Sequence, residues 1–123
     1  MNFLYFPKKS LGQNFLTDKN IIKKIIKIGN INKNKTILEI GPGYGNLTNY
    51  IIEKNPKKIF AIEKDKKLFL FLKNKFKNVN NFNVINEDIL NFIGKRFFSS
   101  GVTVLGNLPY NISTQILASL ILL

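Results

Sequence analysis

The chain contains no cysteine and no histidine, and Arg96 is its only arginine. Without cysteine it can form neither a disulfide nor a thiolate metal site. The absence of histidine removes the commonest general base and the commonest metal ligand. Any chemistry must therefore depend on carboxylates, amides, tyrosine and lysine, and we expect no metal centre.

Acidic residues are also scarce, since 7 Asp and Glu accompany 19 Lys and Arg, for a formal net charge of +12. Such a balance suits a polyanionic partner such as nucleic acid. The chain is, however, rich in Lys, Asn and Ile and poor in Arg, whose planar guanidinium suits phosphate better. That pattern is also typical of a coding bias towards AT-rich codons, so the charge alone leaves both explanations open.

Long apolar runs are missing, and the stretch "LASLILL" at the end is far too short to span a membrane. The opening "MNFLYF" has no basic region before it and is followed at once by "PKK", so it does not resemble a signal peptide. With 123 residues, 45% of them hydrophobic, the chain can form one domain with a core. We expect a cytoplasmic protein that binds no membrane and is a monomer.

Short apolar strands alternate with amphipathic helices along the chain. The first helix is predicted in "TDKNIIKKIIKIG", capped by Thr17 or Asp18 and ended by Gly29, with a buried stripe of Ile21, Ile22, Ile25, Ile26 and Ile28. Strands are predicted in "TILEIG", "KKIFAIE", "NFNVINED" and "VTVLG", and a last helix in "NISTQILASLILL". This alternation predicts an α/β fold with a parallel sheet.

We divide the chain into an N-terminal arm with a cap helix, residues 1–35, and a partial α/β domain, residues 36–123. The strand at 102–105 should lie inside a sheet, because parallel strands are covered on both faces. The last helix ends on leucines and isoleucine with nothing obvious to cover it. The sequence therefore resembles the front portion of a larger domain.

A glycine-rich loop, "GPGYG", follows the strand "TILEI" and contains Gly41, Gly43 and Gly45. Glycine permits φ > 0 and a close approach of a ligand to the backbone, and the next helix presents unpaired N–H groups. The spacing fits neither the dinucleotide fingerprint nor the nucleoside-triphosphate loop, because both motifs require a glycine at the position that Asn46 occupies. A tight turn without a ligand is the competing explanation.

Carboxylates follow the next two strands. Glu63 ends "AIE", where it can accept both ribose hydroxyls of an adenosine, and Asp88 in "NEDIL" can accept from an adenine amino group. Each could also be a solvated loop residue. Because ligands of such sheets bind at the carboxyl ends of the strands, the glycine loop and the two acids together predict a nucleoside site.

The uncharged stretch "NLPY" follows the strand at 102–105 at the same edge of the sheet. The side-chain oxygen of Asn107 and the carbonyl of Leu108 can both accept from an adenine amino group, which needs no strong base before it attacks. Pro109 stiffens the loop, and Tyr110 offers a face on which an extruded base can stack. An ordinary Asn-Pro turn is the alternative. We predict that these four residues form the catalytic part of the site.

Five motifs in order resemble the S-adenosylmethionine-dependent ribosomal RNA adenine N6-dimethyltransferases of the KsgA type: "KKSLGQNFLTD", "ILEIGPGYGNLT", "AIEKD", "NEDIL" and "LGNLPYNIST". The resemblance covers nearly the whole chain. It implies a Rossmann-like class I methyltransferase fold, here truncated after about four parallel strands. Family members carry further strands and a helical C-terminal domain that contacts RNA.

The resemblance also implies an activity and residue roles. The family dimethylates N6 of two adjacent adenosines near the 3′ end of small-subunit (16S) ribosomal RNA, on a pre-assembled small subunit, during ribosome biogenesis. Asn14 and Leu16 would close over the donor, and Gly41 would lie against its methionine part. The donor's ribose would be held by Glu63 and its adenine by Asp88, while Asn107 would border both donor and target amine.

Other interpretations stay open. Relatives that methylate large-subunit RNA share most of the motifs, although "LGQNFL" and "NLPYNIS" are more similar to the small-subunit enzymes. A non-catalytic RNA-binding or ribosome-assembly factor could depend on Lys8, Lys9 and the first helix. A decayed gene product is a third possibility, which we base on a bare edge of the strand at 102–105 and on the apolar last helix.

Overall fold

The computed structural model describes residues 2–6, 19–95 and 102–107 of the chain. Within these residues strands and helices alternate from β2 onward, which confirms the predicted pattern. The elements are β1 (Asn2–Phe6), α2 (Lys19–Gly29), β2 (Thr36–Ile40), α3 (Asn46–Glu53), β3 (Lys58–Glu63), α4 (Lys66–Lys75), β4 (Phe82–Asn86), α5 (Ile89–Lys95) and β5 (Val102–Asn107).

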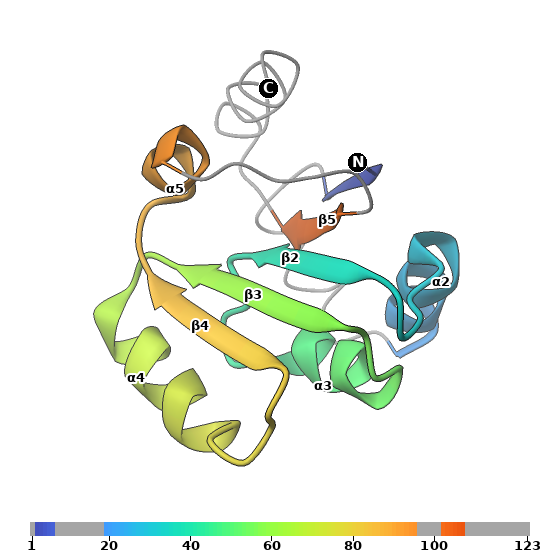
Figure 1. The fold of residues 1–123 in the computed structure, drawn as a ribbon, viewed down its shortest axis with the longest axis horizontal. Helices are drawn as coiled ribbons and strands as arrows, with labels where there is room; N and C mark the ends of the chain where they lie inside the picture. Colours follow the sequence, from blue (N-terminus) through green and yellow to red (C-terminus); the bar gives the residue numbers. More distant parts are fainter. Residues whose placement is uncertain (1, 7–18, 96–101, 108–123) are drawn as a thin grey trace.

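The strands form one parallel sheet in the order β1-β5-β2-β3-β4 (Figure 1). Strands β2 to β5 are the four that the sequence predicts, and β5 lies inside the sheet as expected. The expected bare edge on β5 is wrong, because β1 pairs with it on the side away from β2. Strand β1 lies within the predicted N-terminal arm and is not among the predicted strands.

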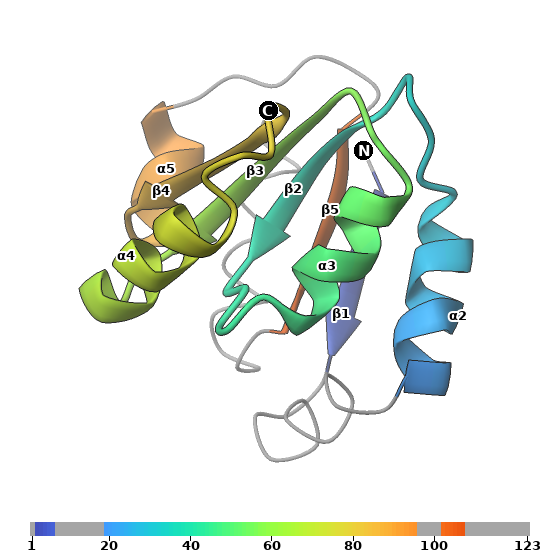
Figure 2. The same cartoon turned by 90° about the horizontal axis from the view of Figure 1, so that it is seen from below.

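Helices cover both faces of the sheet, with α2, α3 and α4 on one face and α5 on the other (Figure 2). Side chains alternate between the faces along each strand. Ile37 of β2 packs in one core cluster with α2 and α3, and its neighbour Leu38 packs in a second cluster with α5. Burial on both faces explains why β2 is almost continuously apolar.

Helix α2 buries one apolar stripe, formed by Ile22, Ile25 and Ile26, and ends at Gly29 as predicted. The prediction that Ile28 belongs to this stripe is wrong, since its side chain is 67% exposed. At about 100° per residue, Ile28 lies roughly a third of a turn away from the centre of the stripe. The caps predicted at 17 and 18 and the last helix, at 111–123, lie outside the described residues.

Because all the strands are parallel, their carboxyl ends meet at one edge of the sheet. The register places Asn107 of β5 one position beyond the pair Gly106 and Ile40, while Glu63 of β3 pairs with Asn86 of β4. The ladder continues past β2, where the Gly41 N–H donates to the Ile62 carbonyl at 3.0 Å. The predicted site residues of the described chain therefore share this edge.

Candidate functional site

The glycine loop, residues 41–45, connects β2 to α3. The φ angles of Gly41, Gly43 and Gly45 are 64°, 60° and 89°, in the left-handed region that other residues rarely adopt. A Cβ on Gly45 would lie 2.9 Å from Cε2 of Phe76, whereas a Cβ on Gly43 would meet nothing within 4 Å. The loop is thus packed against the end of α4 at Gly45 and open at Gly43, where a ligand can approach the backbone.

Glu63 ends β3 and holds this loop. Its Oε1 accepts a hydrogen bond from the Gly43 N–H at 3.2 Å, and its Oε2 accepts one from the Asp65 N–H at 2.9 Å. The residue is only 6% exposed. An ionised carboxylate can accept about four hydrogen bonds, so capacity for further donors remains beyond these two.

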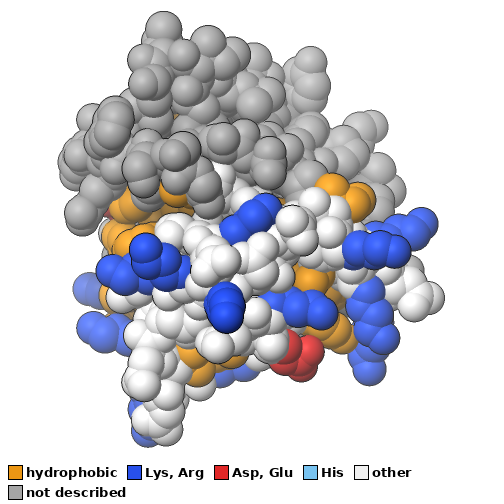
Figure 3. Space-filling view, turned by 45° about the vertical axis from the view of Figure 1, so that its right-hand side comes forward, with side chains coloured by type: hydrophobic (Ala, Val, Ile, Leu, Met, Phe, Trp, Pro, Cys, Tyr) orange, Lys and Arg blue, Asp and Glu red, His pale blue; other side chains and the backbone are white. Residues whose placement is uncertain are grey.

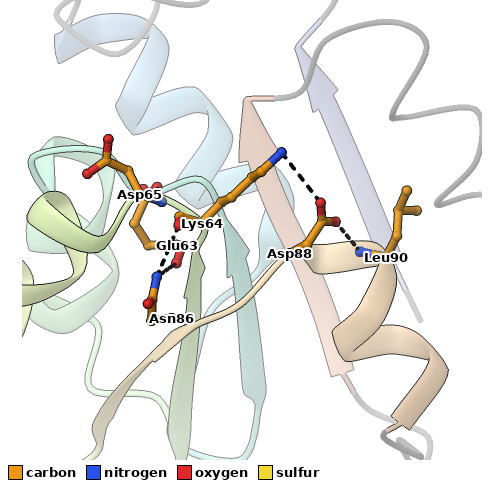
Figure 4. Close-up of polar contacts among 6 residues, drawn as sticks. All are labelled: Glu63, Lys64, Asp65, Asn86, Asp88 and Leu90. Carbon is orange, nitrogen blue, oxygen red and sulfur yellow. Dashed lines mark hydrogen bonds and ion pairs between the residues drawn. The ribbon is translucent and has the colours of Figure 1, made fainter.

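The tip of β4 is tied to that of β3 by Asn86. Its Nδ2 donates to the carbonyl oxygens of Glu63 and Lys64, each at 3.0 Å (Figure 4). These bonds fix the position at which the chain leaves β4 towards α5. Asp88 is therefore held at the same edge as Glu63.

Asp88 has a structural role that the sequence analysis does not predict. Its Oδ1 accepts from the Leu90 N–H at 2.9 Å, and its carbonyl accepts from the Phe92 N–H at 3.0 Å, so it caps the start of α5. Its Oδ2 lies 3.6 Å from Nζ of Lys64 (Figure 4), whose side chain is 79% exposed. A surface ion pair of this kind is weak, so Oδ2 can exchange it for a ligand group.

The other predicted site residues lie beyond the described side chains. Asn107 is the last residue of β5, and only its backbone is described. The predicted catalytic residues Leu108, Pro109 and Tyr110 and the predicted cofactor residues Asn14 and Leu16 lie outside the described residues.

The residue before Asn107, Gly106, lies too close to β2 to carry a side chain. A Cβ on Gly106 would lie 2.7 Å from the carbonyl oxygen of Ile40 and 2.9 Å from its Cβ. Real Cβ atoms do not come so close, so glycine is required here for β5 to pack beside β2. Gly106 therefore allows β5 to stay paired with β2 up to the residue that precedes Asn107.

A further carboxylate, Glu39, lies buried in β2, two residues before the glycine loop, and no role was predicted for it. It is 1% exposed, and its Oε1 accepts from Oγ1 of Thr48, itself fully buried in α3, at 2.5 Å. The pKa of Glu39 is raised from 4.5 to about 7, chiefly by burial; the hydrogen bond from Thr48 opposes this rise, and the negative charge of Glu63 makes a smaller contribution to it. The available signal was an acid within an apolar strand, nine residues before a threonine in the following helix.

Lysine side chains are spread over the described part of the face in Figure 3. Hollows of about 500 Å³ between α2 and α3, and about 490 Å³ beside α4 and β4, are not lined by any predicted site residue. Among the described residues there is no group of three or more acids that could hold a metal ion. No helix of that part of the chain is long and apolar enough to cross a membrane.

Comparison with known proteins bears on the whole chain. Residues 7–122 match the family described as ribosomal RNA adenine dimethylase. The chain is 51% identical over 115 residues to ribosomal RNA small subunit methyltransferase A of Pelagibacter ubique, and 52% identical over 122 residues to that of Wigglesworthia glossinidia brevipalpis. These matches cover 94% and 96% of the chain but 43% and 46% of the relatives, so the chain spans less than half of their length.

Solved structures give the same picture of the fold. A dimethyladenosine transferase from Plasmodium falciparum superposes with a TM-score of 0.71 at 30% identity, over 85% of this chain and 37% of that one. The 23S rRNA methyltransferase ErmE superposes with a TM-score of 0.72 at 27% identity, over 86% of this chain and 42% of that one. The sheet and its helices are therefore a partial Rossmann-like methyltransferase fold.

Proposed function

Since the chain belongs to the ribosomal RNA adenine dimethylase family, we propose that it is the N-terminal portion of an S-adenosylmethionine-dependent enzyme. The enzyme dimethylates N6 of two adjacent adenosines near the 3′ end of small-subunit ribosomal RNA. It acts in the cytoplasm, as a monomer, on the pre-assembled small subunit. Residues 36–123 supply the donor-binding part of the domain, and residues 1–35 form the arm and the cap helix.

The described residues fit an adenosyl donor. The backbone at Gly43 faces open space, which suits the methionine part of the donor near Gly41. Glu63 can accept the ribose hydroxyls with its remaining lone pairs while it keeps its bond to the loop. Asp88 offers Oδ2 to the adenine amino group while Oδ1 caps α5. Asn14 and Leu16 complete this part of the site in our proposal.

The donor supplies a methyl group on a positively charged sulfur. The chain supplies acceptors for the target amine, which are the Asn107 side chain and the Leu108 carbonyl. They favour a more tetrahedral nitrogen as it attacks, so no general base is needed before the attack, and the proton that the nitrogen loses after methyl transfer passes to water. Pro109 fixes the loop, and Tyr110 stacks on the target base. A charged loop would be less suitable here, because the methyl donor is itself a cation.

The observation that carries this proposal is the common edge. Parallel pairing brings Gly41, Glu63, Asp88 and the backbone of Asn107 to the carboxyl ends of neighbouring strands. Ligands of open α/β sheets bind at that edge. The family match does not by itself locate a site.

The proposal is tested by methyl transfer with the complete product of the gene, incubated with small ribosomal subunits and labelled S-adenosylmethionine. We expect N6,N6-dimethyladenosine in digested RNA. Asn107→Ala should lower turnover about 100- to 1000-fold, as the loss of one transition-state partner does elsewhere, while donor binding stays largely intact. Normal transfer by Asn107→Ala would refute its role. Binding of RNA without any binding of donor would favour the assembly factor instead.

A further inference from the structure

An aromatic pair stands on the surface beside the glycine loop. The rings of Tyr44, within the loop, and Phe71, on α4, meet edge to face with centroids 5.5 Å apart. Tyr44 is 66% exposed and Phe71 is 44% exposed, and the neighbouring Leu70 is 52% exposed. At these exposures both rings offer surface to a partner.

The surroundings of this pair are cationic. Nζ of Lys75 donates to the carbonyl of Tyr44 at 2.9 Å and lies 5.7 Å from the centroid of the Phe71 ring. Lys67 is exposed and lies one helical turn before Phe71 on the same face of α4. Residues 64–79 contain six lysines and a single acid, Asp65, whose Oδ1 caps α4 by accepting from the Leu68 N–H.

We propose that this surface, which we call the aromatic-lysine surface and define as Tyr44, Lys67, Leu70, Phe71 and Lys75, binds single-stranded RNA. Unpaired bases stack on the two rings, and the ammonium groups contact phosphates. This inference rests on the proposed function for its choice of RNA. It adds the place where the strand crosses the protein.

The charge and the position favour RNA over other partners. A protein partner would have to supply acids to neutralise lysines that this surface leaves without carboxylates, whereas RNA carries a charge on every phosphate. Tyr44 stands between Gly43, where the loop is open, and Gly45, where it packs on α4. An RNA strand on the two rings would therefore pass the edge of the sheet that holds the proposed donor site.

The test measures fluorescence anisotropy of a labelled single-stranded RNA of about ten nucleotides, a typical site length for such surfaces, with the 123-residue chain at several salt concentrations. Phe71→Leu and Tyr44→Leu keep apolar bulk but remove the ring. Each should weaken binding about fivefold or more, the usual loss per stacked base. Lys67→Gln should reduce the slope of log affinity against log salt by about 0.7, the value for one phosphate contact on a single strand.

Matched controls lie on α2, away from the surface. Ile28→Ala removes an apolar side chain that is 67% exposed, and Lys24→Gln removes an exposed lysine. Both should bind RNA nearly as the unchanged chain does. Thermal unfolding of Phe71→Leu and Tyr44→Leu checks that the fold is kept, which their exposure favours.

Three results would overturn the inference: no binding of RNA by the unchanged chain, binding by both leucine variants that equals binding by the unchanged chain, or ring-dependent binding of anionic phospholipid vesicles in place of RNA. Parallel calorimetric titrations of the unchanged chain and of Phe71→Leu with S-adenosylmethionine separate this inference from the proposed function. Donor binding together with ring-independent RNA binding sinks the inference alone. Ring-dependent RNA binding without donor binding sinks the proposed enzyme alone.

Discussion

Replacing Glu39 with Gln should change how the stability of the chain depends on pH. The carboxyl is buried and its pKa is raised from 4.5 to about 7, so between these values the folded chain binds a proton that the unfolded chain releases. The contribution of this group to stability is fully present below about pH 4.5 and is lost as the pH rises through about 7. The difference in pKa corresponds to about 3 kcal/mol in the free energy of unfolding.

The assay is urea unfolding followed by circular dichroism at about pH 5 and about pH 8, with the unchanged chain and Glu39→Gln. Other titrating groups cancel in the comparison. Relative to the unchanged chain, the variant should gain about 2 to 3 kcal/mol between the two pH values. Glu53→Gln, at an exposed carboxylate of α3, is the control for the chemical change. Parallel pH profiles of Glu39→Gln and the unchanged chain, within about 0.5 kcal/mol, would refute the reasoning.

Three further substitutions test the packing around the site. Thr48→Val removes the hydrogen bond that stabilises the charged form of Glu39. The free energy of unfolding should therefore fall more in the variant than in the unchanged chain when the pH is raised from about 5 to about 8. A smaller fall would contradict this. Gly45→Ala combines a φ of 89° with a contact of 2.9 Å to Phe76 and should cost about 1 to 3 kcal/mol more in urea unfolding than Gly43→Ala, which meets no neighbour; equal losses would count against it. Gly106→Ala would drive a Cβ into the Ile40 carbonyl and should lower the melting temperature by several degrees, roughly 2 kcal/mol; an unchanged melting temperature would show that β5 can move.

The strand-and-helix alternation could be predicted because each element carries its own pattern. Ile22, Ile25 and Ile26 follow the helical period, and "TILEI" is a short apolar run ended by glycine. Placing Glu63 and Asp88 at one edge needed only the rule that consecutive strands of such folds are parallel. These predictions depend on local sequence and on a general rule of topology.

What the sequence could not reveal depends on contacts between distant segments. Strand β1 is stabilised by its pairing with β5, about a hundred residues later in the chain, and the residues "NFLYF" alone do not indicate that pairing. The burial of Glu39 depends on which side of β2 faces α3, and its polarity in an apolar strand gave only a weak hint. The capping role of Asp88 depends on where α5 begins.

We propose above all that this chain carries an adenosyl-donor site in which the Glu63 carboxylate accepts hydrogen bonds from the ribose hydroxyls. The most direct measurement is isothermal titration calorimetry, in which S-adenosylmethionine is titrated into three proteins: the unchanged chain, Glu63→Gln and the control Glu53→Gln. We predict one saturable site, unchanged in the control and weakened about tenfold or more in Glu63→Gln, since hydrogen bonds to charged groups are worth about 1.5 to 3 kcal/mol. Absence of saturable heat, or equal affinity in Glu63→Gln, would contradict the account.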